Sequence, residues 1–235
     1  CSVPLDLVLV LDKSGSVRYA QQQIFAFARD LVGQFSLGSA SLAQVGLVEF
    51  NHDASVLLGL SSSLSEFESA ISGASAAGGL TSVSDGLAAG LSVLEGAASR
   101  SGVPRVLLLL TDGVQTADGD DRTAIAQASV VKGAGVQVFA VGFGGARAST
   151  LSGIASSSSH SYMGADMEAI REHFAASSLC EAASSPRLPP SPPSAPHSPS
   201  PPPSPPSPPT APPLPPLCSV PLDLVLVLDK SGSVR

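Results

Sequence analysis

The stretch LDLVLVLDKSGS, residues 5–16, decides the fold and points to the site. Residues 5–11 form an apolar run that follows Pro4 and ends at a polar loop, a pattern that predicts a buried strand. Two further runs, RVLLLLT at 105–111 and VQVFAVG at 136–142, are also apolar on both faces. Strands buried on both faces are typical of parallel sheets covered by helices. The sequence therefore predicts a mostly parallel sheet in the interior of a domain.

Helical patterns separate the strands along the chain. Ser82 and Asp85 resemble a capping box that starts one helix. Glu49 lies in a predicted strand and is expected to face outward or to lie at an edge. The remaining predicted elements are strands at 44–50, 54–60 and 160–164 and helices at 20–33, 64–72, 120–132, 149–156 and 166–178. This alternation predicts an α/β fold, doubly wound, with helices on both faces of the sheet.

Oxygen-bearing side chains follow two of the apolar strands. The first strand ends in DKSGS, and TDG closes the strand at 105–111, while GGLT precedes a predicted helix. Ligands of such sheets bind beyond the carboxyl ends of the strands, so these segments are expected to meet there. Their hard oxygen donors suit Mg²⁺, Ca²⁺ or Mn²⁺ better than zinc or copper. The candidate metal ligands are Asp12, Ser14, Ser16, Thr81 and Asp112, with waters completing the shell and one position open to an outside oxygen.

This pattern resembles the von Willebrand factor type A (VWA) domain, whose metal-ion-dependent adhesion site (MIDAS) combines D-x-S-x-S with a distant threonine and a distant aspartate. The resemblance covers residues 1–180 and matches all five candidate positions. It implies a VWA, or Rossmann-like, fold and a divalent cation as cofactor. Many family members carry a second threonine two places after the first, where this chain has Val83. That departure affects outer hydrogen bonding and removes no expected direct ligand.

Three cysteines bear on the compartment. Cys1 and Cys180 bracket the predicted domain, so either a disulfide closes its ends or the two are unrelated free thiols. A disulfide would imply an oxidising, extracellular environment. The VWA resemblance implies the Cys1–Cys180 pairing, because such domains commonly join their termini in this way. Cys218 would then pair within a following repeat.

The charge and the motifs of the sequence argue against three classes of protein: nucleic-acid binders, membrane-spanning proteins and enzymes. Residues 1–180 carry 16 acidic and 9 basic residues, a net charge of −7, which argues against nucleic acid as a partner. Apolar runs such as VLLLL at 106–110 are too short to cross a bilayer. No histidine pairs with a cysteine or with a G-x-S-x-G serine, so the sequence predicts no enzyme. The acidic run at 118–121 is better explained by a helix N-terminus than by a calcium loop.

Residues 181–217 differ sharply from the rest, with 18 prolines and 8 serines in 37 positions. Proline disfavours helix and sheet and favours extended polyproline II, so residues 186–216 would reach roughly 95 Å if straight. A plain spacer and a docking ligand for SH3 or WW domains are both open interpretations. The S-P-P runs also resemble hydroxyproline-rich glycoproteins of the extensin and pherophorin type. That resemblance implies an O-glycosylated rod, with possible sites at Pro189, Pro190, Pro192, Pro193, Ser198, Ser200, Pro201, Pro202, Pro203, Ser204, Pro205, Pro206, Pro208 and Pro209.

The eighteen residues 218–235 repeat residues 1–18 without a change. They are interpreted either as the start of the next domain in a tandem array or as a strand donated to a neighbour's sheet, and the array is favoured. The predicted organisation is a domain at 1–180, a linker at 181–217 and a second start at 218–235. The expected function is structural: an extracellular fibre, matrix or wall component whose partners are further copies of itself, glycans or matrix proteins. The alternative is a metal-dependent adhesion module on a proline-rich stalk.

Overall fold

The structure is a computed structural model that describes residues 2–39, 42–174 and 178–181. Its centre is a six-stranded sheet in the order β3-β2-β1-β4-β5-β6. All neighbouring strands are parallel except β2 and β3, which form an antiparallel pair. The strands are β1 Leu5–Asp12, β2 Ala43–Phe50, β3 Ala54–Ser61, β4 Arg105–Thr111, β5 Gln137–Gly142 and β6 Ser161–Met163. The predicted mostly parallel α/β sheet is confirmed.

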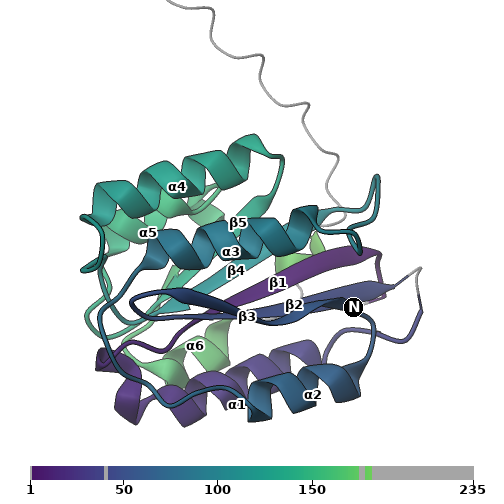
Figure 1. Cartoon of the computed structure of the whole chain (residues 1–235), viewed down its shortest axis with the longest axis horizontal. Helices are drawn as coiled ribbons and strands as arrows, with labels where there is room; N and C mark the ends of the chain where they lie inside the picture. The colour runs from purple at the N-terminus through teal and green to yellow at the C-terminus, as the bar shows by residue number, and fades with distance from the viewer. Residues whose placement is uncertain (1, 40–41, 175–177, 182–235) are drawn as a thin grey trace, which may run out of the picture. The chain divides into compact units, whose positions relative to one another are not determined.

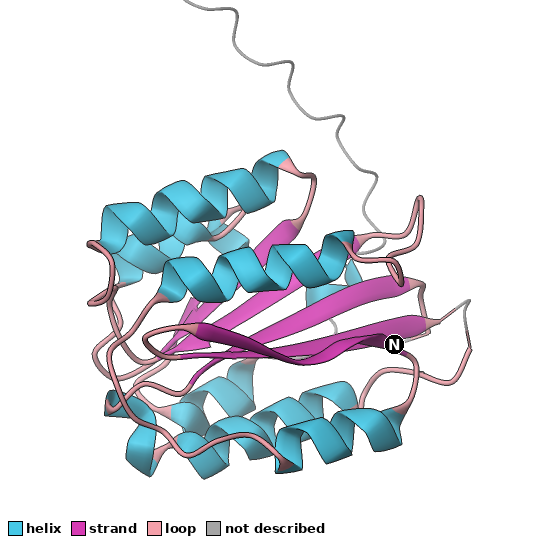
Figure 2. Cartoon of the chain, in the orientation of Figure 1, coloured by secondary structure: helices cyan, strands magenta, loops and turns pink. Residues whose placement is uncertain are grey.

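Two layers of helices enclose the sheet (Figures 1 and 2). Helices α1, α2 and α6 cover one face, and α3, α4 and α5 cover the other. Their bounds are α1 Gln21–Val32, α2 Leu64–Ser72, α3 Val83–Glu95, α4 Asp121–Gly133, α5 Ala148–Ile154 and α6 Met167–His173, with short 3-10 turns at Ser16–Tyr19 and Ser158–His160. Residues 175–177, within the last predicted helix, lie outside the described residues.

The alternation of side chains along β1 produces two cores. Leu7 and Leu9 pack into the cluster under α1, α2 and α6, whereas Val8 and Val10 pack into the cluster under α3, α4 and α5. Successive side chains of a strand point to opposite faces, so a strand between two helical layers must be apolar throughout. This is why the uninterrupted apolar run of β1 forms a central strand.

Helix α3 packs closely against the sheet through two glycines. A Cβ atom on Gly86 would stand 2.8 Å from the ring of Phe50, and one on Gly90 would stand 2.7 Å from Leu107. The two glycines are one turn apart and face β1, β2 and β4, so their missing side chains permit the close approach. The predicted capping box is wrong, because Ser82 makes no side-chain cap hydrogen bond. Its hydroxyl lies beside Ser84 instead.

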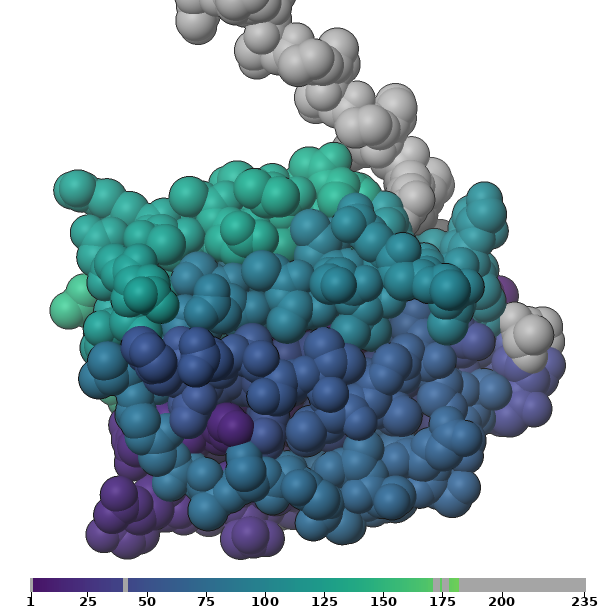
Figure 3. All heavy atoms as spheres, viewed as in Figure 1, coloured from purple at the N-terminus to yellow at the C-terminus, as the bar shows by residue number. Residues whose placement is uncertain are grey.

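Strand β3 forms one edge of the sheet and comes to the surface between the two helical layers (Figure 3). Ser55 and Val56 are exposed there. The carboxyl ends of β1 and β4 lie in the middle of the sheet, well inside this edge. Central strands therefore position the loops that carry the predicted ligands.

Candidate metal centre

The two predicted carboxylate ligands lie at the ends of adjacent strands. Asp12 is the last residue of β1, and Asp112 follows β4 directly. The two strands pair in parallel, with Leu11 opposite Leu110. Parallel pairing places both strand ends at one edge, so residues a hundred positions apart become neighbours.

A chain of hydrogen bonds runs between the two carboxylates. The Ser14 amide donates to Asp12 Oδ1 over 2.7 Å. The Ser14 and Ser16 hydroxyls are 3.0 Å apart, and Ser16 Oγ donates to Asp112 Oδ1 over 2.7 Å. The structure therefore brings four of the five predicted residues into one connected group.

Thr81 reaches the same place from the segment before α3. A Cβ atom on Gly113 would stand 3.6 Å from Thr81 Oγ1 and 3.7 Å from Ser16 Oγ, so both hydroxyls border one point. Thr81 is buried, its amide donates to Thr116 Oγ1 over 2.9 Å, and its carbonyl accepts the Thr116 and Ala117 amides. All five predicted oxygen donors thus gather at one end of the sheet.

Thr111 belongs to the site and was missed in the sequence. This last residue of β4 is buried, and its Oγ1 donates to Asp12 Oδ2 over 2.5 Å. It also accepts the Gly113 amide. In the sequence Thr111 ends an apolar strand and looks like an ordinary strand residue. Its adjacency to Asp112 was the one available signal, and it does not specify a role.

The electrostatics of the site favour a cation. Burial raises the pKa of Asp12 from its ordinary value of 3.8 to about 6; hydrogen bonds from Thr111 and Ser14 oppose this rise, and repulsion from Asp112 adds to it. Burial also raises the pKa of Asp112, and the Ser16 hydrogen bond opposes that rise. Among the side chains described, no Lys, Arg or His forms an ion pair with either carboxylate. The two carboxylates therefore gather negative charge at the site, and within the described residues no basic side chain is paired with them.

The donor set fits a hard divalent cation. Within the described residues, no three His, Cys, Asp or Glu side chains cluster as a metal site. A cation here would therefore take two carboxylates and neutral hydroxyls, a set that suits oxygen-seeking divalent ions. Val83, at the family's second threonine position, is buried and supplies no hydroxyl.

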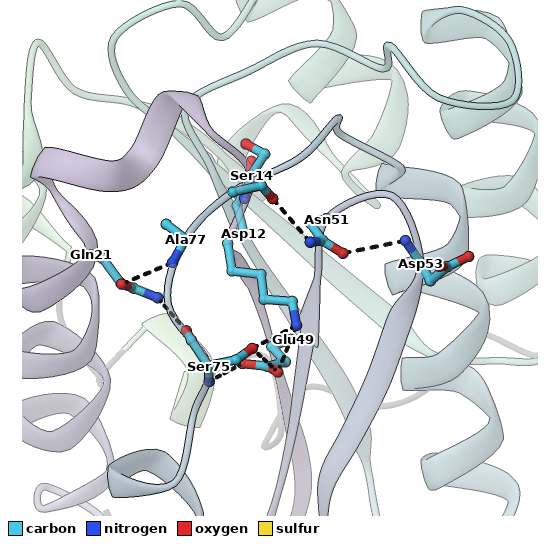
Figure 4. A network of polar contacts seen from close by, with 10 residues as sticks. Asp12, Ser14, Gln21, Glu49, Asn51, Asp53, Ser75 and Ala77 are labelled. Atoms are coloured by element: carbon cyan, nitrogen blue, oxygen red, sulfur yellow. Dashed lines mark hydrogen bonds and ion pairs between the residues drawn. The ribbon is translucent and has the colours of Figure 1, made fainter.

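A second polar network lies directly beside these ligands. Lys13, between Asp12 and Ser14, pairs with Glu49 over 2.8 Å and donates to Ser75 over 2.7 Å. Figure 4 shows Glu49 and Ser75 linked to each other, and Gln21 linked to Ser75 and Ala77. The expectation that Glu49 faces outward or lies at an edge is wrong, because Glu49 is 5% exposed on an interior strand.

The other groups that the sequence singled out either have a structural explanation or lie outside the described residues. Asp120 caps α4 through the Arg122 amide, as expected for acidic residues at a helix N-terminus. Cys180 is disulfide-bonded, but Cys1, Cys218, the proline tract and the repeat at 218–235 lie outside the described residues. The Cys1–Cys180 pairing stays a prediction. In the described ranges, no helix has the length and hydropathy needed to cross a membrane.

Comparison with known proteins places this site in context. A family model for the von Willebrand factor type A domain matches residues 6–176. The human collagen alpha-6(VI) chain is 32% identical over an alignment of 160 residues, and the match covers 66% of this chain and 7% of the collagen chain. This chain thus spans a small fraction of that curated relative.

Solved structures of other proteins share this fold. Proximal thread matrix protein 1 from the mussel byssus, in a form with a zinc-occupied MIDAS motif, has a TM-score of 0.66 and 27% identity, covering 77% of this chain and 46% of the mussel chain. The pilus adhesin SpaC from Lactobacillus rhamnosus GG has a TM-score of 0.64 and 18% identity, covering 77% and 30%. The likeness to SpaC concerns the fold alone.

Proposed function

The chain belongs to the von Willebrand factor type A domain family, and from this premise we propose that it is a non-enzymatic, extracellular domain that binds a divalent cation and builds a matrix, wall or fibre. Relatives that occur in matrix and thread proteins support a structural role. The observation that carries the metal proposal is the pair of clustered carboxylates, Asp12 and Asp112, which no described basic side chain neutralises.

In this proposal Asp12, Ser14, Ser16, Thr81 and Asp112 hold the cation, directly or through water. The cation neutralises the two carboxylates and attracts an oxygen donor from outside. Asp112 is half-buried and Ser16 is exposed, so the centre faces solvent on their side. A carboxylate of a neighbouring protein or a glycan oxygen would occupy the open position. Adhesion through such a bridge requires no chemical step.

Two observations bear on the identity of the cation. Hard oxygen donors favour Mg²⁺, Ca²⁺ or Mn²⁺. The mussel thread protein carries zinc in its MIDAS motif, so oxygen donors alone do not exclude zinc. All four ions belong in the test.

We further propose that the domain alternates with stiff, glycosylated rods in a tandem array. The support is in the sequence: 18 prolines within residues 181–217, and the exact recurrence of residues 1–18 at 218–235. An oxidising environment would suit both the Cys1–Cys180 pairing and O-linked glycans. Mass spectrometry of the tract from its natural source tests this proposal, because hydroxyl and sugar increments are expected on the prolines and serines.

Calorimetric titration of the chain with Mg²⁺, Mn²⁺, Ca²⁺ and Zn²⁺ tests the metal centre. We expect one site per domain, and we expect Asp112→Ala to abolish it. Asp118→Ala is the matched control, since it removes an exposed carboxylate outside the group of five. Equal binding by wild type and Asp112→Ala would refute the centre.

The alternative is an adhesion module that holds a soluble ligand through the same site. Electron microscopy of the native material separates the two, since an array gives periodic filaments and a module gives separate particles. If EDTA changes neither assembly nor ligand binding, the cation has no functional role in either case.

A further inference from the structure

We propose that Lys13, Glu49 and Ser75 form a positioning cluster that sets the place of Thr81 at the metal centre. This inference rests on the proposed metal function and concerns residues outside the five ligands. None of the three offers an atom to the cation in this proposal. They act by holding the segment that delivers Thr81.

The cluster is compact and mutually satisfied. Lys13 Nζ lies 2.8 Å from Glu49 Oε1 and 2.7 Å from Ser75 Oγ. Ser75 Oγ lies 2.8 Å from Glu49 Oε1, and the Ser75 amide donates to Glu49 Oε2 over 3.2 Å. The side chains of Lys13 and Glu49 are 13% and 6% exposed. Three residues from distant parts of the chain are thereby locked together next to Asp12.

Ser75 lies in the strap, defined here as residues 74–82, which joins α2 to α3 and carries Thr81. The strap is fixed mainly by hydrogen bonds. Gln21 holds the Ser75 carbonyl and the Ala77 amide, and Asn51 Nδ2 donates to the Gly78 carbonyl (Figure 4). Further backbone bonds of the strap run from Gly78 N to Lys13 O, from Gly15 N to Gly79 O and from Ser82 N to Asn51 O. At its far end, Thr81 also bonds Thr116 and Ala117, so the strap is held at both ends.

Packing holds the strap much less firmly. Its sequence, ASAAGGLTS, contains one large apolar residue, Leu80, which is 51% exposed. Gly79 has a φ of +84°, a conformation that other residues rarely adopt. A segment with so little apolar burial takes its position from its polar partners. Lys13 holds the strap at two points, because its carbonyl accepts the Gly78 amide while its side chain donates to Ser75.

A buried ion pair is weak evidence for stability, because desolvation offsets the attraction between the charges. Placing a ligand-bearing segment gives this pair a function that stability alone does not supply. Lys13 also lies between two candidate ligands in the sequence. A shift of its backbone would therefore move Asp12 and Ser14 as well. Partners of metal ligands that act in this way typically affect metal affinity by about 10–100-fold.

The loss of the Lys13 charge and the loss of its hold on the strap would change cation affinity in opposite directions in Lys13→Met. Removing a cation beside the metal centre, and leaving Glu49 as an anion, would tighten cation binding if electrostatics alone mattered. If Lys13 positions the strap, the same change weakens binding. We expect a loss of about tenfold in Mn²⁺ affinity. Unchanged or tighter binding by a folded Lys13→Met protein would overturn the proposal.

Ser75→Ala repeats the test without a change of charge and without a buried charge left unpaired. We expect Mn²⁺ affinity to fall several-fold, while Ser69→Ala, an exposed serine on α2, leaves it unchanged. Circular dichroism and thermal melting in EDTA show whether each variant is folded. If Lys13→Met fails to fold, the result for Ser75→Ala decides.

A double-mutant cycle with Thr81→Ala separates positioning from a general loss of structure. If the cluster acts through Thr81, Ser75→Ala costs little further affinity once Thr81→Ala is present. Additive losses would overturn the proposal. Absence of Mn²⁺ binding by the wild type would instead refute the proposed metal function, so the two failures are distinct.

Discussion

Ser16 and Asp112 are 96 positions apart in the sequence, yet Ser16 Oγ donates a 2.7 Å hydrogen bond to Asp112 Oδ1. The parallel pairing of β1 with β4 produces this contact. The two loops are therefore joined through the protein's own atoms, and a cation would meet an arrangement that is already assembled. Preorganised ligands lose less conformational freedom when they bind.

Ser16→Ala is expected to lower divalent-cation affinity by about tenfold. The variant loses one candidate ligand and also the donor that opposes the rise in the pKa of Asp112. Ser101→Ala, an exposed serine in the loop before β4, serves as the control. Calorimetry with Mn²⁺ measures both variants, and equal affinity in the two would contradict the role of Ser16.

Asp12→Asn is expected to stabilise the cation-free protein while abolishing cation binding. The pKa of Asp12 rises from 3.8 to about 6 because the residue is 1% exposed, so its ionised form weakens the fold at neutral pH by up to about 3 kcal/mol. Asparagine keeps the shape without the charge. Melting in EDTA near pH 7 should show a higher Tm for the variant, and added Mn²⁺ should raise the Tm of the wild type alone. A lower Tm in EDTA would show that the carboxylate stabilises the apo fold.

Acid should affect cation binding and apo stability in opposite directions. The folded pKa of Asp12 is above its unfolded value, so its destabilising effect is fully present above about pH 6 and fades as the pH falls toward 3.8. Cation binding needs the carboxylate, so affinity should fall below about pH 6, by about tenfold per pH unit for one displaced proton. Titrations at a series of pH values measure the slope. A flat profile between about pH 7 and 5 would contradict the raised pKa.

The sequence predicted what depends on local pattern. Apolar runs at 5–11, 105–111 and 136–142 indicated the central strands because burial on both faces leaves a continuous apolar signal. The polar residues after two of those strands indicated where Asp12 and Asp112 would meet. Thr81, in contrast, was assigned a place by family resemblance as much as by pattern, since a threonine before a helix is common.

The features missed or misjudged depend on partners far along the chain. Glu49 looked like an edge or outward residue, but its partner Lys13 lies 36 positions earlier and appears only after β2 pairs with β1. Ser82 has the spacing of a capping box, yet its hydroxyl lies beside the Ser84 hydroxyl and accepts a hydrogen bond from the side-chain amide of Gln115. Local rules describe a segment in isolation, whereas these side chains follow tertiary contacts.

Arg100→Met is expected to destabilise the domain by about 3–5 kcal/mol without changing cation affinity, because it leaves buried Asp6 without its partner. Arg100 binds Asp6 through both its side chain and its backbone amide. Its side chain also donates to the Leu42 and Leu5 carbonyls. These bonds lie at the amino-terminal ends of the strands, opposite the metal centre. Urea unfolding measures the loss. Arg147→Met is the control, since the Arg147 side chain is 64% exposed and its pair with Asp121 should be worth less than about 1 kcal/mol. A similar loss of unfolding free energy in both variants would show that the buried Arg100–Asp6 pair contributes no more than an exposed pair.

Gly86→Ala and Gly133→Ala make the same change in two helices and should have opposite effects. In α3, the new Cβ would stand 2.8 Å from Phe50 and 2.9 Å from Val10, both fully buried, so the helix must move away from the sheet. Overpacking of this kind costs about 1–3 kcal/mol, against a gain of about 1 kcal/mol in helix propensity, so a net loss is expected. In α4, a Cβ on Gly133 would meet nothing within 4 Å apart from its chain neighbours and the backbone of its own helix, and the substitution should be neutral or stabilising. Urea unfolding of the two variants therefore isolates the contact between α3 and the sheet, and equal stability would show that the helix can shift at no cost.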